Sequence, residues 1–165
     1  MWSNVDLDNK ILIVNQSLNR RKDIENISHT KTLLSLAPPK TKKGIRTINL
    51  PDKLFTDLLE YKKKQALLFG RNPEAVIANN LGGLFEPRNY TRLFYHLVKK
   101  SGIEWTNFHA LRHTFATRAI EQGMDVLVLS YILGHAQPST TLNKYGHVLD
   151  DHKRESMKKM DDIYV

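Results

Sequence analysis

The stretch NFHALRHTFATRAIEQG, residues 107–123, predicts an amphipathic helix with a permanent charge inside its apolar stripe. At about 100° per residue, one face of such a helix collects apolar side chains. These are Phe108, Leu111, Phe115 and Ala119. Arg112 falls in the middle of that face, and His109 lies one turn earlier on its flank. The solvent side has its own polar set, which is His113, Thr114, Thr117, Arg118 and Glu121.

Arg112 needs a partner if it is buried, because an unpaired cation is costly to remove from water. Acidic residues are sparse nearby: Glu104 precedes the helix, and Glu121 points away from Arg112. A phosphate group of a ligand would suit the planar guanidinium, which can hold two oxygens. The alternative is that Arg112 extends to the surface or pairs with a distant acid. His109 is a second candidate phosphate donor, or else a helix-start or core histidine.

The composition favours a globular domain with a polyanionic partner. The chain has 165 residues, of which 41% are hydrophobic and 25% charged, and its net charge is +8. We expect nucleic acid rather than an anionic membrane surface, because the basic residues are spread over several elements. The absence of cysteine excludes disulfide and thiolate chemistry and fits a reducing cytoplasm. We find no apolar run of membrane-spanning length and no signal-peptide pattern in MWSNVDLDNK.

The order of the predicted elements indicates a single α+β domain. A β-branched run at 10–18 and two strands around a turn within 30–51 predict a small antiparallel sheet. Helices are predicted at 51–70, 87–102, 107–123, 125–134 and 138–149. Residues 150–160 continue as helix or tail, and residues 74–86 form an irregular segment.

Three short motifs occur in an order that resembles the tyrosine recombinases, the phage-type integrases. HALRH supplies His109 and Arg112, LGH supplies Gly134 and His135, and TTLNKYGHV supplies Tyr145. PPKTKKGIRTINLP resembles the β-hairpin of that family, which carries a catalytic lysine. The match runs from WSNVDLDNK to the helix after Tyr145. It implies the family's catalytic fold, a small antiparallel sheet followed by a mostly helical domain.

The resemblance implies DNA strand transfer without metal or ATP. Tyr145 would attack a backbone phosphate of double-stranded DNA and form a 3′-phosphotyrosyl bond. Arg112 would stabilise the charge on the non-bridging oxygens, and His109 and His135 would bind those oxygens or relay a proton. Lys40 would supply a proton to the leaving 5′ oxygen, although Lys42 and Lys43 share its turn.

Each of these residues also fits an ordinary structural role. Tyr145 has helical spacing to Leu142 and Leu149, which is typical of a packing residue. Gly134 and His135 resemble a helix stop followed by a loop histidine. A lysine in a basic turn is commonly only solvated, and this applies to Lys40. The shared order of the motifs is what raises the functional interpretation, and it comes from the resemblance.

Further basic residues are candidates for DNA-phosphate contacts. Lys42, Lys43 and Arg46 lie with Lys40 in the predicted hairpin, and Arg88 and Arg92 share one helix face at i, i+4 spacing. Such residues add affinity more than sequence choice. The run at residues 62–64 reads as ordinary solubilising charge.

The resemblance also implies parts that this sequence lacks. The family has another catalytic arginine upstream of WSNVDLDNK, and a separate N-terminal DNA-clamping domain; Arg20 and Arg21 do not fit the missing motif. We therefore expect residues 1–165 to be one catalytic domain, truncated at its N-terminal edge and with little or no cleavage activity alone. The full-length protein is expected to act as a homotetramer on DNA in a bacterial cytoplasm, for a phage or other mobile element.

Rival interpretations are a helix-turn-helix regulator, a zinc hydrolase and a DNA-binding fragment that cannot cleave. Residues 115–134 contain two helices around a glycine-containing turn, but DVLVLSYIL is nearly all apolar and would be buried, whereas a recognition helix needs polar readers. His109 and His113 have the i, i+4 spacing of zinc ligands. The glutamate of H-E-x-x-H is missing, however, and Arg112 would repel a metal ion.

Overall fold

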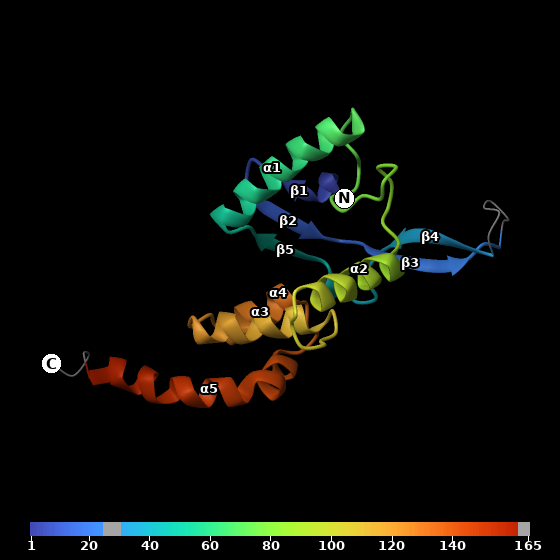
Figure 1. The fold of residues 1–165 in the computed structure, drawn as a ribbon. Helices are drawn as coiled ribbons and strands as arrows, with labels where there is room; N and C mark the ends of the chain where they lie inside the picture. The colour runs from blue at the N-terminus through green and yellow to red at the C-terminus, as the bar shows by residue number, and fades with distance from the viewer. Residues whose placement is uncertain (25–30, 162–165) are drawn as a thin grey trace. The chain divides into compact units, whose positions relative to one another are not determined.

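The computed structural model describes residues 1–24 and 31–161. The elements are η1 (Trp2–Asn4), β1 (Val5–Asp6), β2 (Ile11–Val14), β3 (Ser17–Lys22), β4 (Thr32–Ala37), η2 (Lys42–Gly44), β5 (Arg46–Asn49), α1 (Asp52–Phe69), α2 (Pro87–Lys100), α3 (Ala110–Glu121), α4 (Val126–Leu133) and α5 (Pro138–Asp161). They divide into two compact units, Met1–Leu97 and Val98–Val165, which are described separately (Figure 1). In the described part of the chain, no helix is both long and apolar enough to cross a membrane.

The first unit contains two small antiparallel sheets instead of the one that the sequence predicts. One has the strand order β1-β2-β5, with Leu12 opposite Ile48, and the other pairs β3 with β4. The predicted strand at 10–18 is therefore two strands, separated by residues 15–16. The predicted pair within 30–51 is also wrong in its pairing, because β4 and β5 belong to different sheets. Pro38 and Pro39 follow β4 directly and lack the N–H that a ladder requires.

The core of the first unit lies between the three-stranded sheet and α1. Trp2, Val5 and Leu50 are buried there, and Phe55 and Leu58 of α1 pack against them. Figure 1 shows α1 beside the strands of this sheet. The long helix follows Pro51 and is ended by a glycine in the left-handed conformation with φ of 64°, as predicted.

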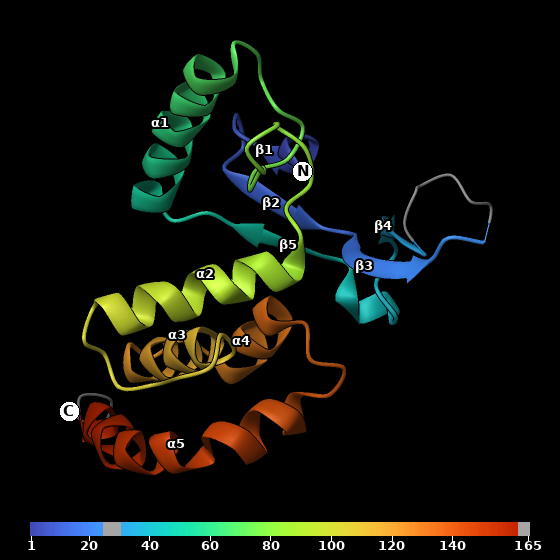
Figure 2. The same ribbon diagram turned by 45° about the vertical axis from the view of Figure 1, so that its right-hand side comes forward.

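The second unit is a helical cluster formed by α3, α4 and α5. Its core consists of Ala116, Ala119, Ile120, Leu129, Leu133 and Tyr145. Figure 2 shows α5 running along the pair formed by α3 and α4. Asp125 caps α4 by accepting hydrogen bonds from the N–H groups of Leu127 and Val128, at 2.8 and 3.1 Å. The segment at 150–160 continues α5 as helix, so of the two predictions made for it the helix is confirmed.

The buried stripe of α3 differs from the predicted one. Phe108, Leu111 and Phe115 are 38%, 53% and 46% exposed, and the residues that face the core are Ala116, Ala119 and Ile120. Two alanines in that line leave room for Leu129 and Tyr145 to pack close to the α3 backbone. A hydrophobicity pattern gives little weight to alanine, which explains why the periodicity selected the neighbouring face.

The prediction that the DVLVLSYIL helix is buried holds for only part of α4. Leu129 and Leu133 are buried, but Leu127 and Val128 are 62% and 51% exposed. Both exposed residues in the first turn of α4, Leu127 and Val128, are apolar, whereas a DNA-recognition helix needs polar readers at its start.

Candidate functional site

The start of α3 positions three candidate residues. His109 directly precedes the helix, and Arg112 and His113 lie in its first turn. The helix begins at Ala110, whose N–H donates to the backbone and side-chain oxygens of Asn107 at 3.0 and 3.1 Å. His109 is therefore the residue just before the first turn, as the sequence suggested. From there, a rotation of about 100° separates Arg112 from His113 and directs them to different neighbours.

Arg112 makes a hydrogen bond to the far end of α4. Its Nη2 donates to the carbonyl oxygen of Leu133 at 2.6 Å, and the side chain is half-buried. The oxygen belongs to the last residue of α4, where the helix dipole is negative and favours a cation. Arg112 takes part in none of the ion pairs among the described residues, so the carboxylate alternative finds no support there. The guanidinium has further N–H donors with which to hold an anion.

His135 is fixed by a buried hydroxyl. It follows Gly134, which ends α4 in the left-handed conformation with φ of 70°. The His135 Nδ1 lies 2.8 Å from Oγ1 of Thr141, a residue in the first turns of α5 that is 0% exposed. The pKa of His135 is lowered, mainly by burial and to a smaller extent by the positive charges of Arg112 and Lys144. The sequence predicted His135 as a site residue, and Thr141 is the group that orients it.

His109 shares the same electrostatic environment. Its pKa is lowered below the usual 6.5, mainly by desolvation and to a smaller extent by the charges of His113, Arg112 and Lys144. Among the residues that the structure describes, every charged group that shifts the pKa of these two imidazoles is positive. This cationic group, which we define as His109, Arg112, His135 and Lys144, suits an anion such as a phosphate.

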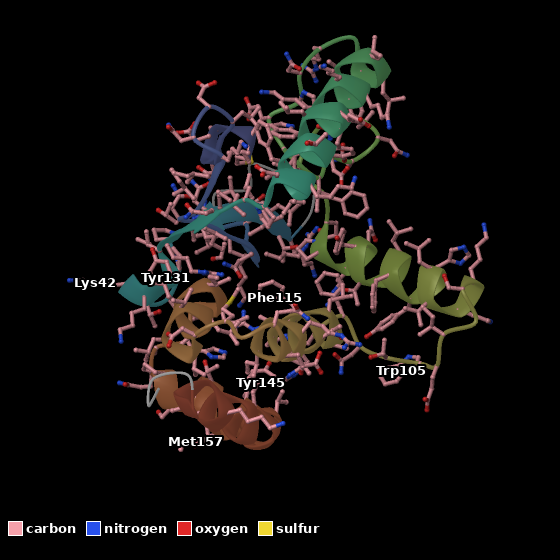
Figure 3. The ribbon with its side chains drawn as sticks, turned by 90° about the vertical axis from the view of Figure 1, so that its left-hand side faces the viewer. Lys42, Trp105, Phe115, Tyr131, Tyr145 and Met157 are labelled. Atoms are coloured by element: carbon pink, nitrogen blue, oxygen red, sulfur yellow. The ribbon has the colours of Figure 1, made fainter. Side chains whose placement is uncertain are left out.

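Tyr145 lies in the core of the second unit, and its hydroxyl contacts a histidine. It is 3% exposed, and its ring packs with the apolar residues of the second unit. Its hydroxyl oxygen lies 2.9 Å from Nδ1 of His113. The rings of His113 and His109 meet edge to face, with centroids 5.0 Å apart. In Figure 3, Tyr145 lies between α5 and α3, so both the packing role and a polar contact of its hydroxyl are present in one residue.

Three residues of this arrangement were missed by the sequence analysis: His113, Thr141 and Lys144. His113 was assigned to the solvent side, and it is exposed, yet its Nδ1 reaches the Tyr145 hydroxyl. The signal available was its place directly after Arg112, which puts it about 100° around the helix and toward a different neighbour. Thr141 lies three and four positions before Lys144 and Tyr145, so a helix through 138–149 places it one turn from each of them.

Lys40 belongs to the first unit, in the loop between β4 and η2. It is exposed, and the loop around it is tightly closed. A Cβ added to Gly44 would lie only 2.5 Å from Cβ of Pro39, so the chain passes itself there at a distance that only glycine allows. Arg46 donates from Nη1 to the Gly44 carbonyl oxygen at 3.0 Å. The grouping of Lys40 with the second-unit residues stays a prediction.

The predicted DNA-contact residues of the first unit are mostly solvent-facing. Lys42 and Lys43 form η2 and are exposed, and Arg88 and Arg92 are exposed on α2 at i, i+4 spacing. Arg46 differs, because its half-buried side chain bonds to its own turn. No metal-binding cluster of three or more histidine or acidic side chains occurs in the described ranges 1–24 and 31–161.

Comparison with known proteins matches the chain to one protein family. The model of the phage integrase family matches residues 1–152. A tyrosine recombinase XerC-like protein of Caldanaerobacter subterraneus is 27% identical over 173 aligned positions, which cover 99% of this chain and 44% of that protein. Transposase A of transposon Tn554 from Staphylococcus aureus is 36% identical, over 69% of this chain and 32% of its own length.

A solved structure agrees with these sequence matches. The integrase of transposon Tn1549, in complex with a circular intermediate DNA, is 26% identical and superposes with a TM-score of 0.73. The alignment covers 96% of this chain and 52% of that one. The α+β fold with small antiparallel sheets and five helices is thereby confirmed. The chain spans half or less of the length of the curated relatives described above.

Proposed function

The chain belongs to the phage integrase family, and on that premise we propose that it forms the catalytic part of a tyrosine recombinase that cuts and rejoins double-stranded DNA. The observation that carries the proposal is the arrangement in the second unit. The Tyr145 hydroxyl, Arg112 and three histidines, which are His109, His113 and His135, come from the start of α3, the end of α4 and the first half of α5. Among the described residues, no acidic side chain shifts the pKa of His109 or His135.

Tyr145 is the proposed nucleophile. Its Oη attacks the phosphorus of a DNA backbone phosphodiester, the Oη–P bond forms, and the bond from phosphorus to the 5′ oxygen breaks. The DNA 3′ end is then held as a phosphotyrosyl diester. The 5′ hydroxyl of a partner strand reverses the chemistry and regenerates the phenol. One diester replaces another in both steps, so neither ATP nor external oxidant enters the balance.

The cationic group is proposed to bind the phosphate that is attacked. Charge develops on its non-bridging oxygens in the transition state, and fixed cations in a partly dry site stabilise that charge most. Arg112 is already held by the Leu133 carbonyl, and His135 by Thr141, so both would meet the phosphate with little reorganisation. His109 is proposed as a third contact to the phosphate oxygens.

The first unit is proposed to supply the proton donor and much of the electrostatic affinity. Lys40 protonates the leaving 5′ oxygen from its closed loop. Exposed cations contact flanking phosphates, which releases counterions and makes binding weaken with salt. They are Lys42, Lys43, Arg88 and Arg92, with Arg46 reaching DNA only if it leaves Gly44. The complete protein is proposed to act as a homotetramer on its recombination sites, in the cytoplasm of a bacterium.

A covalent-capture assay tests this function. The protein expressed from its complete gene is mixed with a pool of nicked duplexes of random sequence, and DNA that stays attached after denaturation in SDS is scored. We expect attachment by the parent and by Tyr131→Phe, a matched tyrosine on α4 of the same unit, and loss of attachment in Tyr145→Phe. Attachment that survives in Tyr145→Phe, or its absence with every duplex of the pool, would contradict the proposal.

A further inference from the structure

We propose that His113 accepts the phenolic proton of Tyr145 when the tyrosine attacks DNA. This inference rests on the function proposed above and adds a catalytic residue to it. It assigns a role to a histidine that stands outside the His-x-x-Arg, Gly-His and tyrosine motifs on which the sequence analysis relied.

The contact itself is the first support. His113 Nδ1 and Tyr145 Oη are 2.9 Å apart, an ordinary distance for a hydrogen bond between a hydroxyl and an imidazole. The ring centroids are 5.8 Å apart with the planes inclined by 56°, so the two groups meet through their polar atoms rather than by stacking. A proton acceptor must be within hydrogen-bond reach of the proton that it takes, and His113 is.

The environment of Tyr145 is the second support. The residue is 3% exposed and its ring is surrounded by Ala116, Ile120 and Leu129. A phenol is a weak nucleophile until a base takes its proton, and the burial of Tyr145 leaves few water molecules near it to do so. The reaction therefore needs a base inside the protein. His113 has its Nδ1 at the phenol while its side chain is exposed, so it joins the buried hydroxyl to solvent.

The placement of the other two histidines separates their roles from that of His113. The Nδ1 of His135 is engaged by the Thr141 hydroxyl, and burial lowers the pKa of this imidazole. His109 contacts the His113 ring edge to face, with ring centroids 5.0 Å apart. The order Tyr145, His113, His109 thus runs from the nucleophile toward the cationic group.

The proton balance closes without any further group. As the Oη–P bond forms, the phenolic proton moves to Nδ1 of His113, and the neutral imidazole becomes an imidazolium. The 5′ oxygen leaves with a proton from Lys40. In the rejoining step, the attacking 5′ hydroxyl gives its proton back to Lys40, and the imidazolium returns its proton to Tyr145 Oη as that oxygen departs from phosphorus. This scheme requires that resting His113 carries its proton on Nε2 and leaves Nδ1 free to accept.

The tautomer can be measured without DNA or turnover. Long-range 1H–15N correlation spectra of the 165-residue chain separate the protonated from the unprotonated ring nitrogen of each histidine. We expect His113 as the Nε2–H tautomer, and we expect its Nδ1 resonance to move when Tyr145→Phe removes the hydroxyl. An Nδ1–H tautomer of His113, or an Nδ1 resonance that Tyr145→Phe leaves unchanged, would overturn the proposal whether or not the protein cleaves DNA.

Cleavage rates of variants show whether His113 transfers a proton or only positions Tyr145. His113→Asn keeps a polar atom near the place of Nδ1 but cannot take a proton, and His96→Asn on α2 is the matched exposed control. In the covalent-capture assay we expect His113→Asn to slow cleavage by about 100-fold or more, the usual contribution of a general base, and His96→Asn to leave it unchanged. Added imidazole should restore cleavage by His113→Gly, because His113 is exposed and its removal leaves a space beside the Tyr145 hydroxyl that free imidazole can enter from solvent.

The outcomes distinguish this inference from the function on which it rests. Cleavage by His113→Asn at the parental rate, while Tyr145→Phe stays inactive, would refute the role of His113 and leave the proposed function intact. Cleavage by Tyr145→Phe would refute the function itself. Thermal unfolding of each variant shows that it is folded, and rescue by imidazole is a result that a purely structural role for His113 would not produce.

Discussion

Replacing Thr141 by valine should loosen His135 at a cost that the structure lets us estimate. Thr141 is 0% exposed, and its Oγ1 lies 2.8 Å from Nδ1 of His135. Valine has nearly the same shape, so packing in the first turns of α5 is kept and the hydrogen bond alone is lost. Because His135 is half-buried, water can partly replace the hydroxyl, which places the cost at about 1 to 1.5 kcal/mol.

The expected change is within reach of thermal unfolding. A loss of 1 kcal/mol lowers Tm by roughly 2 to 4 °C in a chain of this size, so Thr141→Val should melt about 2 to 6 °C below the parent. Thr140→Val is the matched control, because Thr140 is the neighbouring threonine and is half-exposed. We expect its Tm to lie within about 2 °C of the parent, since surface changes rarely exceed 0.5 kcal/mol.

The same variant tests the link from Thr141 to function. If the hydroxyl orients His135 toward a DNA phosphate, Thr141→Val should also reduce covalent capture of DNA, and Thr140→Val should not. A Thr141→Val protein that melts with the parent and captures DNA equally well would refute the reasoning, since neither stability nor His135 would then depend on the buried hydrogen bond.

Two further predictions concern the loop of the first unit and the two histidines of the cationic group. Gly44→Ala should destabilise the chain by about 1 to 3 kcal/mol in urea unfolding, because the new Cβ would lie 2.5 Å from Cβ of Pro39 and the loop must move. Gly146→Ala is the control, because its new Cβ meets nothing within 4 Å, and it should be neutral or stabilising. DNA binding should strengthen as pH falls from 7.5 to 5.5 at fixed salt, because the pKa values of His109 and His135 are lowered in the free protein and a phosphate would raise them, so that protons are taken up on binding. Fluorescence anisotropy with a labelled duplex measures this, and a pH-independent affinity would contradict it. In the absence of DNA, the free energy of unfolding should instead decrease as pH falls below 6.5. His109 and His135 bind protons more readily in the unfolded chain, because folding lowers their pKa values.

The helices were predictable because their ends are marked by residues with one strong preference. Pro51 and Gly70 bound α1, and Gly134 ends α4, so the sequence located these helices to within a few residues. The strands were less predictable. A run of β-branched residues does not reveal with which strand it pairs, and the two sheets of the first unit depend on long-range register.

The sequence proposed the members of the candidate site but not their contacts. Motif order pointed to His109, Arg112, His135 and Tyr145, and the structure places all four in the second unit. Their partners came from tertiary packing that periodicity does not encode. The Leu133 carbonyl becomes available only where α4 ends. His113 meets the Tyr145 hydroxyl only because two alanines let α5 approach α3 closely.

The most direct test of the central claim is to identify the atom of the protein that becomes bonded to DNA. The protein from its complete gene is trapped on nicked duplexes, the DNA is digested with nuclease, and tryptic peptides are sequenced by mass spectrometry. We predict a nucleotide adduct joined through phosphate to Tyr145 of α5. An adduct on any other side chain, or a trapped complex whose Tyr145 peptide is unmodified, would contradict the assignment of this tyrosine as the nucleophile.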